Sequence, residues 1–320
     1  MKLQTHIPLP KEQNPIGYAS KLLLLGSCFV ENIGDKLGYY KFQTEQNPFG
    51  ILFHPLAIEK LLTKALKDQE YSEKDIFFFN ERWHCLDAHS NLSSSNKEEL
   101  LHKLALGLKQ TREQLQKASH IILTLGTAWV YTFKETQQVV ANCHKIPQKQ
   151  FSKRLLSAAE IQESCGRIIA LIRHINQGAS IVITVSPVRH LKDGFVENQR
   201  SKAHLITGVH SGIEHAKLPL SVSYFPSYEI MMDELRDYRF YKQDMVHPNA
   251  LAIAYIWEKF VEVWIAKDAQ NVMDKVAQVQ KGIQHRPFNS DSLEHKSFLK
   301  ALEKKKTYLE QTYPFMKFNP

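Results

Sequence analysis

Ser27 stands where a predicted strand runs into a predicted helix. Residues 22–25 form an apolar run that is typical of a buried parallel strand. In residues 31–40 the apolar positions recur about one turn apart, which predicts a helix directly after the strand. Ligands of α/β folds bind at this edge of the sheet. The Ser27 hydroxyl is therefore either a helix N-cap or a nucleophile held at a helix N-terminus.

A carboxylate and an imidazole, Asp244 and His247, lie close together further along the chain. Pro248 suits the first turn of a helix, and the strongly apolar residues 250–264 predict that helix. In the loop before it, the carboxylate can accept the Nδ1–H of the imidazole and leave Nε2 to take a serine proton. The alternative is a capping aspartate beside a surface histidine.

Strands and helices alternate along the chain in the way that predicts right-handed βαβ units and a parallel sheet. Further buried strands are predicted at residues 120–125, 180–185 and 220–226. Helices are predicted at residues 58–66, 97–118, 161–176, 201–215 and 227–235. A strand or hairpin at residues 75–83 and a hairpin at residues 130–140 should lie outside this sheet.

The predicted strand ends bring several polar residues to one edge of the sheet. Thr127 follows one central strand, and Arg189 follows the next. The loop of Asp244 and His247 is expected at the same edge as Ser27. This convergence favours a catalytic site over an isolated helix cap.

Four short motifs, taken in order, resemble one protein family. They are Gly26-Ser27-Cys28-Phe29, Asn47-Pro48-Phe49-Gly50, Gly126-Thr127-Ala128-Trp129 and Asp244-x-x-His247. The set is similar to the GSCFA family, within the SGNH (GDSL-like) hydrolase superfamily. The resemblance implies a three-layer α/β/α sandwich with a central parallel sheet and a Ser-His-Asp site, in which Ser27, His247 and Asp244 serve an esterase or acyltransferase. We expect the catalytic domain at residues 1–267 and a helical extension at residues 268–320.

Acyl transfer also needs hydrogen-bond donors aimed at the tetrahedral oxyanion. The Ser27 N–H at the helix N-terminus is one candidate, and the resemblance implies the Gly50 N–H as a second. The third donor of the superfamily is usually the asparagine of a Gly-x-Asn motif, but here the strand end contains no asparagine. The Thr127 hydroxyl and the Asn142 amide are the remaining candidates. Each has a local alternative, since Thr127 can bond to backbone and Asn142 can belong to a turn.

Three residues at this edge are predicted to bind substrate. Arg189 has the paired donors that hold a carboxylate or phosphate, or else it holds a loop through a salt bridge. His190 follows it at the same strand end. Trp129 belongs to a group of aromatic residues that would form either a platform for a sugar or part of the core.

The composition excludes several other classes of protein. The 41 Lys and Arg against 33 Asp and Glu are spread widely, without a zinc-finger, RRM or helix-turn-helix signature, so we expect no nucleic-acid partner. No apolar stretch has the length of a membrane span, and none resembles a signal peptide. The four cysteines lack a CxxC pair, which favours a reducing cytoplasm. The 15 histidines show no metal-binding spacing, so we expect neither a metal nor a cofactor.

These observations predict a serine hydrolase (esterase) or acyltransferase that acts on an O-acyl ester, with a carbohydrate ester as the favoured substrate. Two alternatives stay open. Cys28 can be the nucleophile in place of Ser27, or the chain can be a non-catalytic binding or scaffold protein that keeps the fold. The helices predicted at residues 269–283 and 292–311 would pack on the core, act as a lid or form a homodimer contact.

Overall fold

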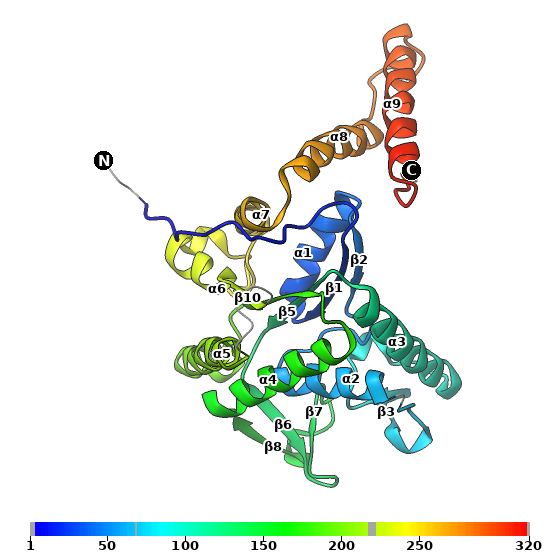
Figure 1. Ribbon diagram of the computed structural model, residues 1–320. Coiled ribbons are helices and arrows are strands. Elements are labelled where there is room, and N and C mark those ends of the chain that lie inside the picture. Colours follow the sequence, from blue (N-terminus) through cyan, green and yellow to red (C-terminus); the bar gives the residue numbers. More distant parts are fainter. Residues whose placement is uncertain (1–3, 68, 217–221, 319–320) are drawn as a thin grey trace.

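A five-stranded parallel sheet forms the centre of the computed structural model, which describes residues 4–67, 69–216 and 222–318 (Figure 1). The strand order is β10-β9-β5-β1-β2, and every neighbouring pair is parallel. The strands are β1 (Lys21–Gly26), β2 (Gln43–Gln46), β5 (His120–Leu125), β9 (Ser180–Val185) and β10 (Val222–Phe225). The predicted α/β fold is thus confirmed.

The central strands are buried on both faces, which is why they are continuously apolar. Because side chains alternate along a strand, Leu22 and Leu24 of β1 pack into one apolar cluster and Leu23 and Leu25 into the other. The second cluster includes side chains of α2 (Pro55–Lys67), α3 (Lys97–Lys117), α4 (Ala158–Ile175) and α5 (Phe195–His215). The first includes side chains of α1 (Cys28–Tyr39) and α7 (Ala250–Trp264). Figure 1 shows these two groups of helices on opposite sides of the sheet.

Two small antiparallel sheets lie outside the central one. The hairpin β3 (Ile76–Phe79) and β4 (Arg82–Cys85) matches the first predicted hairpin. The second hairpin, β6 (Trp129–Phe133) and β7 (Gln138–Val140), gains a third strand, β8 (Phe151–Leu155), on the other side of β6. No strand was predicted at β8 because three of its five residues are polar and exposed.

Three predicted elements differ from the structure. Asn249 is the N-cap of α7, with its Oδ1 accepting the Ala252 N–H at 3.1 Å, so Pro248 precedes the helix and does not lie in its first turn. The helix predicted at residues 227–235 is broken into α6 (Ser227–Glu229) and a π-helical segment. The α5 helix begins at Phe195, earlier than predicted, and residues 220–221 of the last predicted strand lie outside the described residues.

The two C-terminal helices are α8 (Lys267–Gln284) and α9 (Leu293–Thr312). Val276 and Val279 of α8 and Leu309 of α9 are buried in the same apolar cluster as α1 and α7. The helices therefore pack on the core, and their contribution to a homodimer stays a prediction. No helix in the described part of the chain is long and apolar enough to cross a membrane.

Gly26 should be irreplaceable at the end of β1. Its φ is +138°, and a Cβ there would lie 2.1 Å from the Thr124 carbonyl oxygen. Gly26→Ala should therefore lower the free energy of unfolding by more than about 2 kcal/mol, measured by urea-induced unfolding. The control is Gly166→Ala in α4, where a Cβ has nothing within 4 Å. That change should raise stability by about 0.5–1 kcal/mol. Equal effects of the two substitutions would refute this account of Gly26.

Candidate functional site

Ser27 occupies the N-cap position of α1, but it does not cap the helix. Its backbone is extended, with φ −71° and ψ 170°, and its side chain makes no capping hydrogen bond. The side chain is fully buried, and Oγ has no hydrogen-bond partner among the described residues. The hydroxyl therefore does not accept a backbone N–H of the helix, as the hydroxyl of a structural cap would.

Asp244 and His247 form the predicted pair in the loop before α7. The His247 Nδ1 lies 2.7 Å from the Asp244 Oδ2, and both side chains are partly exposed. The Asp244 Oδ1 also accepts the backbone N–H groups of His247 and Val246, each at 2.9 Å. These backbone bonds, followed by the bond to the imidazole, hold the pKa of Asp244 well below its usual range. The carboxylate is thus ionised and orients the ring.

Arg189 holds this loop in place. Its Nη2 donates to the Met245 carbonyl oxygen, and its backbone N–H donates to the Val246 carbonyl oxygen at 3.1 Å. The buried guanidinium also lies 4.2 Å from the centre of the Tyr241 ring. Arg189 was predicted either to bind substrate or to hold a loop through a salt bridge. In the structure it holds a loop, but its partners are carbonyl oxygens and not a carboxylate.

His190 and Ser27 approach each other across Gly126. A Cβ on Gly126 would lie 3.1 Å from the Ser27 Cβ, 3.2 Å from the His190 Nε2 and 3.3 Å from the Phe53 Cδ1. The His190 Nε2 is buried and, like the Ser27 Oγ, has no hydrogen-bond partner among the described residues. Burial lowers the pKa of His190 to about 3, with further lowering by the charges of Lys202 and His247. The ring is therefore neutral.

Lys202 is a buried amine beside this group. It is 1% exposed, and its Nζ donates to the carbonyl oxygens of Gly126, at 2.8 Å, and Ser186, at 2.7 Å. These carbonyl groups lie in the loops that follow β5 and β9. Burial lowers the pKa of Lys202 to about 7. The amine thus ties together two of the loops that form the edge of the sheet.

Neither Lys202 nor Phe53 was predicted from the sequence as part of the site. Lys202 lies on the buried face of α5 with Leu205 and Val209, and a lysine in phase with apolar residues signals a buried amine. Phe53 lies in the segment between the Asn-Pro-Phe-Gly motif and α2. No pattern in that segment marks its ring as a neighbour of Ser27.

The backbone donors predicted for an oxyanion are already engaged. The Ser27 N–H donates to the Thr124 carbonyl oxygen at 2.9 Å, and the Gly50 N–H donates to the Asn47 carbonyl oxygen at 2.7 Å. Both bonds belong to local structure, the first to the β1–β5 ladder and the second to a turn. Neither N–H can donate to a substrate oxygen in this arrangement.

Each of the two side chains considered as third donor accepts a hydrogen bond from a nearby backbone N–H. The Thr127 Oγ1 accepts the Trp129 N–H at 3.0 Å and lies 3.1 Å from the Ser201 Oγ. The Asn142 Oδ1 accepts the His144 N–H at 2.8 Å. These are the local alternatives, a hydroxyl bonded to backbone and a turn residue. The Asn142 amide still lines the pocket described next.

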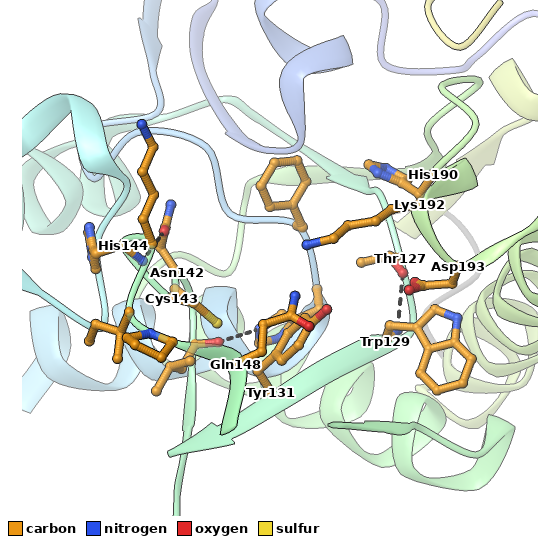
Figure 2. A pocket seen from close by; sticks show the side chains of 17 residues that line it. Thr127, Trp129, Tyr131, Asn142, Cys143, His144, Gln148, His190, Lys192 and Asp193 are labelled. Carbon is orange, nitrogen blue, oxygen red and sulfur yellow. Dashed lines mark hydrogen bonds between the residues drawn. The ribbon is translucent and has the colours of Figure 1, made fainter. Parts of the chain in front are cut away.

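A pocket of about 610 Å³ opens beside His190 (Figure 2). Thr127, Trp129 and His190 lie on one side of it, and Asn142 and Cys143 on the other. Tyr131, Gln148 and Lys192 also line it. Ser27, Asp244 and His247 do not. The structure therefore brings His190 and Trp129 to the pocket, whereas Ser27 is not among the lining residues and lies near His190 and Phe53 at Gly126.

Fold and site together define an α/β protein in which a serine without a partner in the described part of the chain and an aspartate–histidine pair lie at the carboxyl edge of a parallel sheet. The family model for the GSCFA family matches residues 21–260, so the chain belongs to the GSCFA family, as its motifs predicted. A second model, described as GSCFA domain protein, C-terminal domain, matches residues 276–320. No curated protein has significant similarity to the sequence.

The pH dependence of the free energy of unfolding should reveal the ionisation of Lys202. The pKa of the Lys202 amine is about 7 in the folded protein and has the ordinary value of 10.5 in the unfolded chain. Between pH 7 and pH 10.5 the folded protein therefore binds fewer protons than the unfolded chain. Wild-type stability therefore rises with pH across that window, and Lys202→Met removes this contribution. The stability of wild type relative to Lys202→Met should increase by up to about 1.4 kcal/mol per pH unit.

Urea-induced unfolding at several pH values across this window measures the effect. Lys300→Met serves as the control because Lys300 is exposed, and its pH dependence should parallel the wild type. A difference between wild type and Lys202→Met that stays constant with pH would show that the buried amine is charged throughout.

Proposed function

We propose that this protein is a serine hydrolase or acyltransferase that acts on an O-acyl ester. Ser27 attacks the acyl carbon, His247 takes the serine proton, and Asp244 holds the imidazole. The observation that carries the proposal is the Ser27 hydroxyl, which is buried at a helix N-terminus and has neither a capping bond nor any other hydrogen-bond partner among the described residues. A buried hydroxyl without a partner is costly, so it calls for a functional reason.

The aspartate–histidine pair supplies the base that such a hydroxyl needs. In the proposed reaction the His247 Nε2 accepts the proton as the bond between Ser27 Oγ and the acyl carbon forms, and it then protonates the leaving alcohol. Asp244 stabilises the imidazolium through Nδ1. Water then hydrolyses the acyl-enzyme in an esterase, whereas an alcohol accepts the acyl group in a transferase.

Two electrostatic effects support a position of the His247 loop near Ser27. The charge of His247 contributes to lowering the pKa of His190, whose Nε2 lies close to Ser27 across Gly126. Lys242, whose N–H bonds the His247 carbonyl oxygen at 2.8 Å, contributes to lowering the pKa of Cys28. The hydrogen bond between serine and imidazole is expected to form with substrate bound, because catalytic bonds are often long in unliganded sites.

The thiol of Cys28 is a poorer candidate nucleophile. Burial, followed by the charge of Glu31, raises its pKa above the ordinary value despite the opposing charges of Lys202 and Lys242. A raised pKa reduces the thiolate fraction, and the thiolate is the reactive form. The serine assignment is therefore favoured.

The pocket favours an ester of a polyhydroxylated alcohol. Trp129 and Tyr131 supply flat apolar rings, and Asn142 and Gln148 supply amides that can bond hydroxyl groups. This combination of rings and amides suits a carbohydrate. We therefore propose that the alcohol part of the ester occupies the pocket and the acyl carbon reaches inward, past Phe53, to Ser27.

Two serines at helix N-termini give a matched test of this proposal. Ser27→Ala should lower kcat/KM for p-nitrophenyl acetate by at least about 10³, because it removes the nucleophile. Its free energy of unfolding should not fall, since an unpaired buried hydroxyl is removed. Ser157→Ala should do the reverse, because Ser157 caps α4 and accepts the Glu160 N–H at 3.2 Å. It should keep activity and lose about 1 kcal/mol of stability.

The histidine and aspartate variants complete this series. His247→Ala should match Ser27→Ala, and Asp244→Asn should cost less because it misdirects the imidazole without removing it. If Ser27→Ala keeps full activity, the proposal is wrong. If the wild-type protein neither hydrolyses p-nitrophenyl acetate nor reacts with a fluorophosphonate at Ser27, the binding or scaffold alternative is favoured.

Access to Ser27 should depend on Phe53. The ring lines the pocket, and its Cδ1 lies 3.3 Å from the position that a Cβ on Gly126 would take, beside the Ser27 Cβ. We therefore propose that the ring separates Ser27 from the pocket. Phe53→Ala should therefore speed fluorophosphonate labelling of Ser27 several-fold, measured by intact-protein mass spectrometry. The control is Phe78→Ala, because Phe78 is 57% exposed on the distant β3. Labelling of Phe53→Ala at or below the wild-type rate would contradict this role.

A further inference from the structure

Two buried polar atoms that have no hydrogen-bond partner among the described residues belong to side chains that come together beside Gly126. They are the Ser27 Oγ and the His190 Nε2, which come from the ends of two different strands. Most buried polar atoms in proteins are hydrogen-bonded, and leaving one unpaired costs about 1–3 kcal/mol. Two such atoms at one place indicate a space in which a ligand atom supplies the missing bonds.

Gly126 keeps this space open. Its missing side chain would lie within 3.2 Å of both the Ser27 Cβ and the His190 Nε2. Because an acyl group on the Ser27 Oγ must lie next to the Ser27 Cβ, its carbonyl oxygen comes within reach of the His190 Nε2. The geometry therefore suits a donor to the oxygen that becomes negative during acyl transfer.

We infer that His190 is a catalytic residue that donates its Nε2–H to the oxyanion, in the place of the asparagine that this chain lacks. The inference rests on the proposed function of Ser27. When the Ser27 Oγ bonds to the acyl carbon, the carbonyl π electrons move to oxygen, and this oxyanion accepts the Nε2–H bond. When the carbonyl re-forms, the alcohol leaves with the proton that His247 carries.

The surroundings of His190 support this role. The low pKa of the ring keeps it neutral, so it donates a hydrogen bond without competing with His247 for the serine proton. The His190 backbone N–H donates to the Asn198 Oδ1 at 2.9 Å, and the ring packs edge to face on Phe53 at 5.7 Å. These contacts hold the ring before substrate binds.

Two backbone N–H groups at the start of α1 are further candidate donors to the oxyanion. The N–H groups of Cys28 and Phe29, at the first two positions of α1, have no partner within the helix, as at every helix N-terminus. They would approach the oxyanion from the α1 side, and His190 from the β9 side. This arrangement replaces the Ser27 and Gly50 N–H groups, which are engaged elsewhere.

Three substitutions distinguish a donor from a base. His190→Ala should lower kcat for p-nitrophenyl acetate by about 10²–10³, the cost of one oxyanion donor, with a smaller change in KM. His190→Gln should recover at least about tenfold of this loss, because its amide nitrogen reaches the position of Nε2 and can donate but cannot take a proton. His190→Asn, whose amide is shorter, should resemble His190→Ala. In all three variants the midpoint of the change of kcat/KM with pH should be the same as in the wild type.

The same series separates this inference from the proposed function. Ser27→Ala is measured beside the His190 variants, and urea unfolding verifies that each variant is folded. If Ser27→Ala is inactive but His190→Ala keeps wild-type kcat, only the role of His190 is overturned. If His190→Gln is as impaired as His190→Ala, His190 acts as a base or through packing and the inference fails. If Ser27→Ala is as active as wild type, both the function and this inference fall.

A spectroscopic measurement tests the tautomer directly. Nitrogen-15 NMR of the wild-type histidines, assigned with His190→Gln, should show His190 as the Nε2–H tautomer without titration from pH 5 to 8. The Nδ1–H tautomer at this position would overturn the inference, because Nε2 would then be an acceptor.

Discussion

One buried amine connects the loops on which the site depends. Lys202 donates to the carbonyl oxygens of Gly126 and Ser186, which follow neighbouring strands β5 and β9. A carbonyl group at a strand end has no ladder partner, so it is satisfied by a side chain, by water or by a ligand. Here a side chain from α5 satisfies two of them, and the loops are held at a fixed separation. The ring of His190 and the gap beside Gly126 owe their positions to this arrangement.

A second cation performs the same task on the neighbouring loop. Arg189 bonds the carbonyl groups of Met245 and Val246, and thereby fixes the loop on which the Asp244 carboxylate turns toward His247. Since Arg189 directly precedes His190, the two histidines are positioned through one short segment. Both cations bond carbonyl oxygens, which leaves the Asp244 carboxylate for the imidazole. Both loops are thus held in place through neutral acceptors.

The fold was predictable from the sequence because the strands at its centre are continuously apolar and alternate with helices. The aspartate–histidine pair was predictable as well, since both residues lie in one loop and their spacing decides their contact. The bonds of the backbone N–H groups were not predictable, because those of Ser27 and Gly50 depend on the register of β1 with β5 and on a turn geometry. The pattern of α5 signals that Lys202 is buried, but its contacts with two loops, like the position of Phe53, depend on tertiary packing.

The burial of Ser27 connects these observations. A hydroxyl that only capped α1 would bond the helix backbone, as Ser157 does at α4, and it would lose nothing by being accessible. Ser27 is instead fully buried near Phe53 and His190 and has no hydrogen-bond partner among the described residues. Electrostatic interactions are stronger in such surroundings than in water. A donor held there, such as His190, therefore contributes more to stabilising a developing anion than an exposed donor would. Under the proposed function, an ester reaches this buried serine only when a neighbouring side chain moves, so the burial that would strengthen the proposed chemistry would also restrict which esters react.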